Sequence, residues 1–90
     1  MWFVKSFENM IRNLAFIDNV GNIKFVDMAG YLFDELSYDS KQIAQAKLVK
    51  NGFKAVDDDY IKVFGEPDQI KTDPYPRQHK VYSSGEYWNE

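Results

Sequence analysis

Residues 3–15, FVKSFENMIRNLA, form the most regularly patterned stretch of the sequence. Plotted at 100° per residue, the apolar side chains of this stretch fall within one arc, and the charged and amide side chains lie opposite. The apolar set is Phe3, Val4, Phe7, Met10, Ile11, Leu14 and Ala15. The spacing predicts an amphipathic helix over residues 3–15 that ends near Phe16.

A turn, a short strand and a second helix are expected next. Residues 18–22 (DNVGN) are rich in Asn and Gly, which tolerate positive φ, so they predict a turn. The β-branched and aromatic content of residues 22–26 indicates a strand. Asp27 is a suitable N-cap, and the apolar spacing that follows it predicts a second helix over residues 28–36.

A third helix is bounded by clear local signals. Asp39 or Ser40 can cap its first turn, and Asn51-Gly52 provides a stop after Lys50. Apolar residues go most of the way round this segment, so we expect it to be sandwiched between neighbours, with Ile43 and Val49 in the core.

The C-terminal third predicts strands and loops. Strands are expected at residues 53–56 and 60–64, followed by a Pro/Gly-containing loop over residues 65–78 and a last strand at 79–82. The predicted fold class is therefore α+β, with three helices packed on a small, mainly antiparallel sheet. At 90 residues we expect one compact domain, residues 1–90, that ends in an aromatic C-terminal tail.

Composition excludes several classes of protein. The chain has no cysteine, which removes disulfide scaffolds, thiolate zinc sites and cysteine nucleophiles. It has no apolar run long enough for a membrane helix and no apparent signal peptide. We therefore expect a cytoplasmic protein that does not associate with membranes.

No catalytic motif is apparent in the sequence. His79 is the only histidine and lies in no triad-like context, and the five glycines stand apart, so no phosphate-binding loop is formed. Asp57, Asp58 and Asp59 could hold a cation only with ligands from elsewhere, such as Glu66 or Asp68. The sequence thus predicts a protein that is not an enzyme and has neither cofactor nor metal. An enzyme would require carboxylates from distant segments to converge in one active site.

Partner binding is the function that the sequence favours. Aromatic residues make up 17% of the chain, more than a small core can enclose, and Tyr and Trp are enriched at interface hot spots. The formal net charge is −3. The predicted contact residues lie in the acidic tip, the loop and the tail: Asp57, Asp58, Asp59, Tyr75, Tyr87 and Trp88. We expect a small acidic regulator or inhibitor, of the kind that phages and mobile elements encode, whose partner is a protein with a basic surface. The oligomeric state is left open.

A winged-helix regulator that binds nucleic acid is the alternative. The predicted order of two helices and a two-stranded ribbon over residues 28–64 is that of a winged-helix domain. Its recognition helix would present Lys41, Gln45, Lys47 and Lys50 to the nucleic acid. The acidic tip of the ribbon and the negative net charge disfavour contact with a polyanion.

Overall fold

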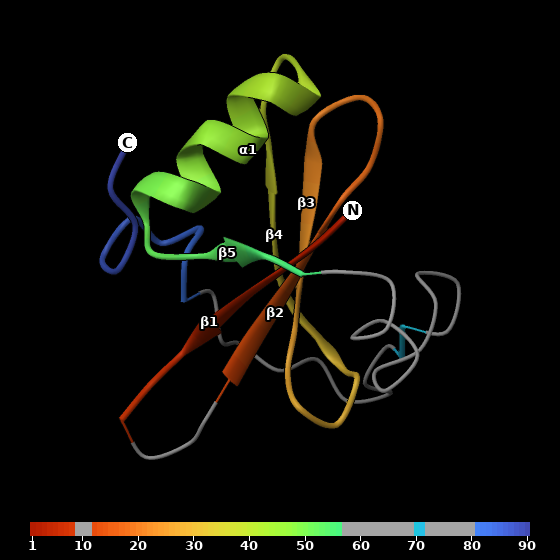
Figure 1. Cartoon of the computed structure of the whole chain (residues 1–90), viewed down its shortest axis with the longest axis vertical. Coiled ribbons are helices and arrows are strands. Elements are labelled where there is room, and N and C mark those ends of the chain that lie inside the picture. Colours follow the sequence, from red (N-terminus) through yellow and green to blue (C-terminus); the bar gives the residue numbers. More distant parts are fainter. Residues whose placement is uncertain (9–11, 57–69, 72–80) are drawn as a thin grey trace.

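A five-stranded antiparallel sheet and one helix make up the computed structural model, which describes residues 1–8, 12–56, 70–71 and 81–90 (Figure 1). The strands lie in the order β4-β3-β2-β1-β5, so the first four form a meander and β5 returns beside β1. The elements are β1 (Trp2–Ser6), β2 (Arg12–Ile17), β3 (Asn22–Val26), β4 (Leu32–Ser37), α1 (Lys41–Lys50) and β5 (Lys54–Ala55).

The predicted helix over residues 3–15 is wrong, because residues 3–6 and 12–15 lie in the paired strands β1 and β2. Trp2 pairs with Phe16 and Ser6 with Arg12 in an antiparallel register. Neighbouring residues of β1 are buried on opposite faces of the sheet, Trp2 in one cluster and Phe3 in the other. A strand buried on both faces loses the apolar–polar alternation by which strands are recognised, which left the helical period as the stronger signal.

The predicted helix over residues 28–36 is also wrong. The Asp27 carboxylate accepts hydrogen bonds from the backbone N–H groups of Ala29 and Tyr31, both at 2.9 Å, and Gly30 has a φ of +90°. Asp27 therefore caps a tight turn between β3 and β4 instead of a helix. With one helix in the described residues, the prediction of three helices on a sheet is overturned, and so is the winged-helix arrangement of residues 28–64.

The third predicted helix and the strand at residues 22–26 are confirmed as α1 and β3. The Ser40 hydroxyl accepts a hydrogen bond from the Ile43 backbone N–H at 3.2 Å, and Gly52 takes a φ of +90° after the last turn. Ala44 and Leu48 pack on the sheet, whereas Ile43 and Val49 are exposed. The helix is therefore covered on one side only, contrary to the prediction that neighbours sandwich it.

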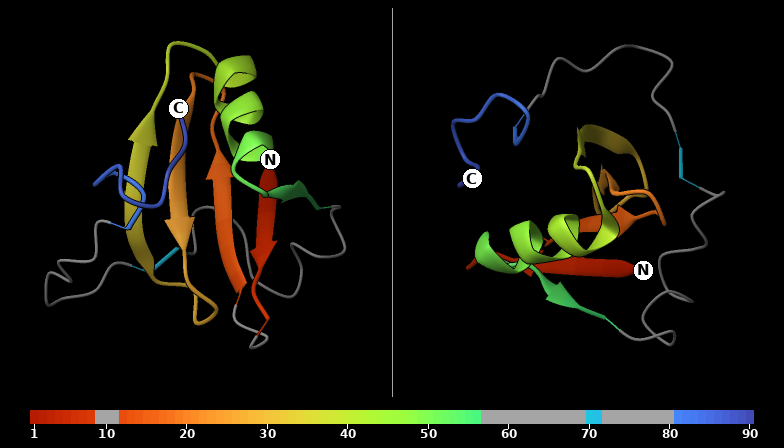
Figure 2. Two further views of the ribbon diagram at one scale, coloured as in Figure 1. Left: turned by 90° about the vertical axis from the view of Figure 1, so that its left-hand side faces the viewer. Right: turned by 90° about the horizontal axis from the view of Figure 1, so that it is seen from above.

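Helix α1 and the C-terminal segment, residues 81–90, lie on the same face of the sheet (Figure 2). The main core forms between them and the strands, and its members are Phe3, Ala15, Ile17, Ile23, Phe25, Ala44, Leu48, Phe53, Tyr82 and Trp88. A smaller cluster on the opposite face contains Trp2, Leu14 and Val26. None of the described helices is long and apolar enough to cross a membrane.

Candidate functional site

The C-terminal segment is attached to the edge strand β4 through a buried carboxylate. One Asp34 oxygen, Oδ2, accepts hydrogen bonds from the backbone N–H groups of Tyr82 at 2.7 Å and Ser83 at 2.8 Å. The other, Oδ1, accepts from the Glu35 backbone N–H at 2.8 Å. The register of β4 shifts between the partners of Phe25 and Val26, which leaves Phe33 as the extra residue of a β-bulge beside Asp34.

A second attachment joins the end of the chain to α1. The Asn51 side chain donates to the Asn89 carbonyl at 2.9 Å and accepts from the Asn89 N–H at 2.7 Å, in the manner of a neighbouring strand. Trp88 Nε1 donates to the Tyr38 hydroxyl at 2.6 Å, and Lys47 contacts Glu90. The segment is thus fixed by side chains far away in the sequence.

These attachments place two of the three aromatic residues predicted as partner contacts, Tyr87 and Trp88, in different environments. The centre of the Trp88 ring lies 5.5 Å from that of Tyr82 and 5.7 Å from that of Phe25, and Trp88 is 6% exposed. Tyr87, its neighbour, is 63% exposed. In this structure Trp88 is a core residue, which removes it from the candidate contacts, and Tyr87 is available on the surface.

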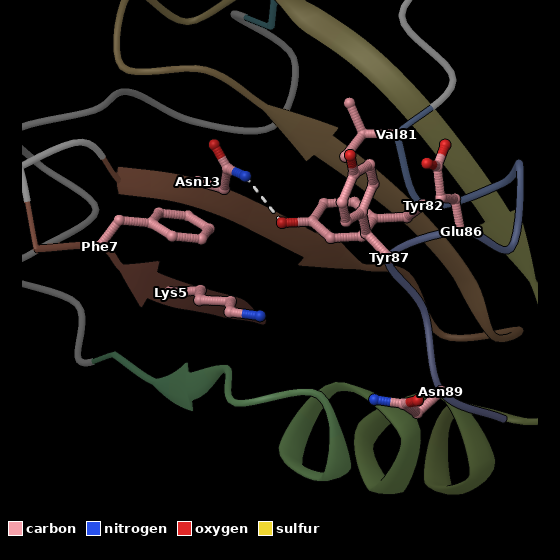
Figure 3. A pocket seen from close by; sticks show the side chains of 8 residues that line it. All are labelled: Lys5, Phe7, Asn13, Val81, Tyr82, Glu86, Tyr87 and Asn89. Carbon is pink, nitrogen blue, oxygen red and sulfur yellow. Dashed lines mark hydrogen bonds between the residues drawn. The ribbon is translucent and has the colours of Figure 1, made fainter.

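An open groove of about 320 Å³ lies between the C-terminal segment and strands β1 and β2 (Figure 3). We call it the Phe7–Tyr87 groove. Phe7, which is 40% exposed, Lys5 and Asn13 line it from the side of β1 and β2. The C-terminal segment contributes Val81, Tyr82, Glu86, Tyr87 and Asn89.

Polar groups meet at the β1–β2 side of the groove. The Lys5 ammonium lies 5.5 Å from the centre of the Phe7 ring and 6.0 Å from that of Phe53, within the range of cation–π attraction. Asn13 Nδ2 donates a hydrogen bond to the Tyr82 hydroxyl at 2.7 Å. Burial, together with the nearby Asp34 charge, raises the pKa of Tyr82 although the Asn13 bond opposes this.

The remaining predicted residues either lie outside the described residues or belong to α1. Asp57, Asp58, Asp59 and Tyr75 lie outside the described residues, as do Glu66, Asp68 and His79. On α1, Lys47 pairs with Glu90 at 3.8 Å and Gln45 Nε2 contacts the Met1 sulfur at 2.7 Å. Lys50 is exposed and Lys41 is half-buried.

Sequence reasoning missed the half of the groove contributed by β1 and β2. It assigned Phe7 to the core of a helix and gave no role to Lys5 or Asn13. The available signal was the i, i+2 spacing of Lys5 and Phe7, which places both residues on one side of extended backbone. That signal becomes useful only once β1 and β2 are recognised as strands.

The described residues contain no group of three His, Asp or Glu side chains that could hold a metal ion. The Phe7–Tyr87 groove brings together hydrogen-bond donors, a cation and exposed rings, which suit binding. No family model matches the chain, and no curated protein or solved structure is significantly similar to it.

Proposed function

We propose that the protein is a small, non-enzymatic binding module that regulates or inhibits a partner protein through direct contact. The observation that carries the proposal is the pair of exposed rings, Phe7 at 40% and Tyr87 at 63%, on the two sides of one groove. Such rings supply large contact areas at little entropic cost when a partner covers them.

The framework behind these rings supports the proposal. Tyr87 follows a segment that Asp34 holds at Tyr82 and precedes one that Asn51 holds at Asn89. Phe7 directly follows β1, the strand next to the centre of the sheet. A surface that is ordered before binding loses less conformational entropy when the partner docks.

Charge complements this contact. With a formal net charge of −3 and three consecutive aspartates at residues 57–59, the chain suits a partner with a basic surface, which would accelerate encounter. We place this activity in the cytoplasm. Binding of nucleic acid is not proposed, because the winged-helix arrangement that motivated it is absent from the fold.

The test is an affinity capture that compares matched variants of the full chain. Phe7→Ala/Tyr87→Ala removes both rings, and Met28→Ala/Val49→Ala removes two exposed apolar side chains outside the groove, which are 51% and 62% exposed. We expect one or a few proteins to be retained by the wild type and by the Met28/Val49 variant and lost, by about tenfold or more, from the Phe7/Tyr87 variant. Equal retention by all three folded proteins would contradict the proposal.

A further inference from the structure

Lys5 is a half-buried residue whose ammonium has no counter-charge in the described part of the chain. Its side chain passes beside Gly52, and its ammonium lies near the rings of both Phe7 and Phe53. No carboxylate of the described residues forms an ion pair with it. A cation with no carboxylate beside it attracts an anion from outside the chain.

The Tyr82 hydroxyl offers a second donor on the same side of the groove. It accepts the Asn13 amide N–H, and within the described residues no acceptor receives its own hydrogen. In Figure 3 the hydroxyl points toward Asn13 and the β1–β2 side of the groove, where Lys5 lies. A phenol keeps this hydrogen at neutral pH, and burial raises the pKa of Tyr82 further.

The acidic residue of the groove lies on the other side. Glu86 comes from the C-terminal segment, and Figure 3 shows its carboxylate directed away from the Lys5 ammonium. The Lys5 end of the groove is therefore positive, and exposed apolar surface from Phe7 and Tyr87 borders it.

We propose that the Phe7–Tyr87 groove receives an acidic side chain, Asp or Glu, that lies next to an apolar residue in a segment of the partner protein. The carboxylate would accept charge-assisted hydrogen bonds from Lys5 Nζ and the Tyr82 hydroxyl, which are the donors that such a group prefers. The apolar neighbour would pack between the rings of Phe7 and Tyr87. A groove of about 320 Å³ has room for one or two side chains and is partly open to solvent.

This inference rests on the proposed function for the source of the carboxylate, but its test needs no partner. The full-length ¹⁵N-labelled protein is titrated with N-acetyl-Phe-Glu-amide, with the neutral N-acetyl-Phe-Gln-amide and with the cationic N-acetyl-Phe-Lys-amide, and amide shifts are followed by NMR. We expect the Glu peptide to shift the Lys5, Phe7, Asn13 and Tyr87 signals and to bind about fivefold or more tightly than the Gln peptide.

Conservative variants assign the effect to the two donors. Lys5→Met keeps the apolar stem and Tyr82→Phe keeps the ring, and each is expected to reduce the preference for Glu over Gln to less than twofold. Lys24→Met, on the exposed side of β3, serves as the control and should keep the full preference.

Three results would overturn the inference: no shifts with any peptide, equal binding of the Glu and Gln peptides, or tighter binding of the Lys peptide, which would make Glu86 the anchor. These results are distinct from failure of the proposed function. If the Phe7→Ala/Tyr87→Ala variant loses the partner in the affinity capture but the peptides show no preference for Glu, the groove binds through its rings alone.

Discussion

Asp34 and Asn51 are the two polar residues that the described part of the fold buries, with exposed fractions of 8% and 6%. Both use their side chains to bind backbone groups of the C-terminal segment. A buried polar group is costly unless it is satisfied, and each satisfied one fixes its partner in a single position. These two residues therefore set the position of Tyr82, Trp88 and the exposed Tyr87 between them.

Truncation of the neighbours Tyr87 and Trp88 is expected to change the free energy of unfolding by very different amounts. Trp88→Ala removes a ring from the main core and the hydrogen bond to Tyr38, so it should reduce the free energy of unfolding by about 3–5 kcal/mol. Tyr87→Ala removes an exposed ring and should change it by no more than about 0.5 kcal/mol. Urea denaturation of both variants measures this, and similar losses would contradict the assignment of Trp88 to the core.

Tyr82 predicts a loss of stability at alkaline pH. Burial raises its pKa in the folded state, so above pH ~10 the unfolded chain loses this proton while the folded chain keeps it. The unfolded state then binds fewer protons, and the free energy of unfolding falls as pH rises through the interval between the two pKa values.

The Tyr82→Phe variant should show a shallower fall. Its own free energy of unfolding, measured by urea denaturation from pH 9 to 11.5, is compared with that of the wild type over the same range. Tyr38, whose pKa burial also raises, contributes equally to both proteins. Identical slopes would show that Tyr82 is not held in a desolvated site.

The turns that join β2 to β3 and β3 to β4 each require a residue with positive φ. Gly21 and Gly30 both have positive φ, +101° and +90°. A Cβ on Gly21 would lie 2.6 Å from the Tyr38 carbonyl oxygen and 2.8 Å from backbone atoms of Ser40, whereas a Cβ on Gly30 would meet nothing within 4 Å. The first turn therefore packs against the start of α1, and the second is open.

Alanine at these two positions separates backbone strain from steric overlap. Gly30→Ala should cost about 1–2 kcal/mol of unfolding free energy through the strain of positive φ alone. Gly21→Ala should cost about 1–3 kcal/mol more, because the backbone around Tyr38 and Ser40 must move. Thermal and urea denaturation give both values, and equal costs would refute the close approach of this turn to α1.

The same elements show what the sequence could and could not predict. Helix α1 was predictable because Ser40 and Asn51-Gly52 are local signals that act within a few residues. The β1–β2 pair was not predictable, because both of its faces are buried by segments that are distant in the sequence. The turn at Asp27 was misassigned because a carboxylate caps helix and turn amides alike.

The candidate site was predictable only in part, for the same reason. Tyr87 was identified as a candidate contact from its residue type and its place in the C-terminal tail. Nothing in the local sequence distinguishes it from Trp88. The buried Trp88 donates a hydrogen bond to Tyr38, 50 residues away, and Asn51 binds Asn89 across 38 residues. Lys5 and Phe7 could join the site only after their segment was known to be extended.

Across the described part of the molecule, six aromatic rings are buried and two exposed rings line one groove. Phe3, Phe25, Phe53, Tyr82 and Trp88 fill the core between the sheet, α1 and the C-terminal segment. Phe7 and Tyr87 remain exposed at the groove where that segment meets the sheet. We propose that a partner protein docks on this groove.

Photo-crosslinking in the source cells tests that claim most directly. The photoreactive amino acid p-benzoylphenylalanine replaces Tyr87 in one protein and the exposed Val49 of α1, away from the groove, in another. We predict a discrete covalent adduct from position 87, lost when Phe7→Ala is added, and none from position 49. No adduct at position 87, or the same adduct from both positions, would contradict the claim.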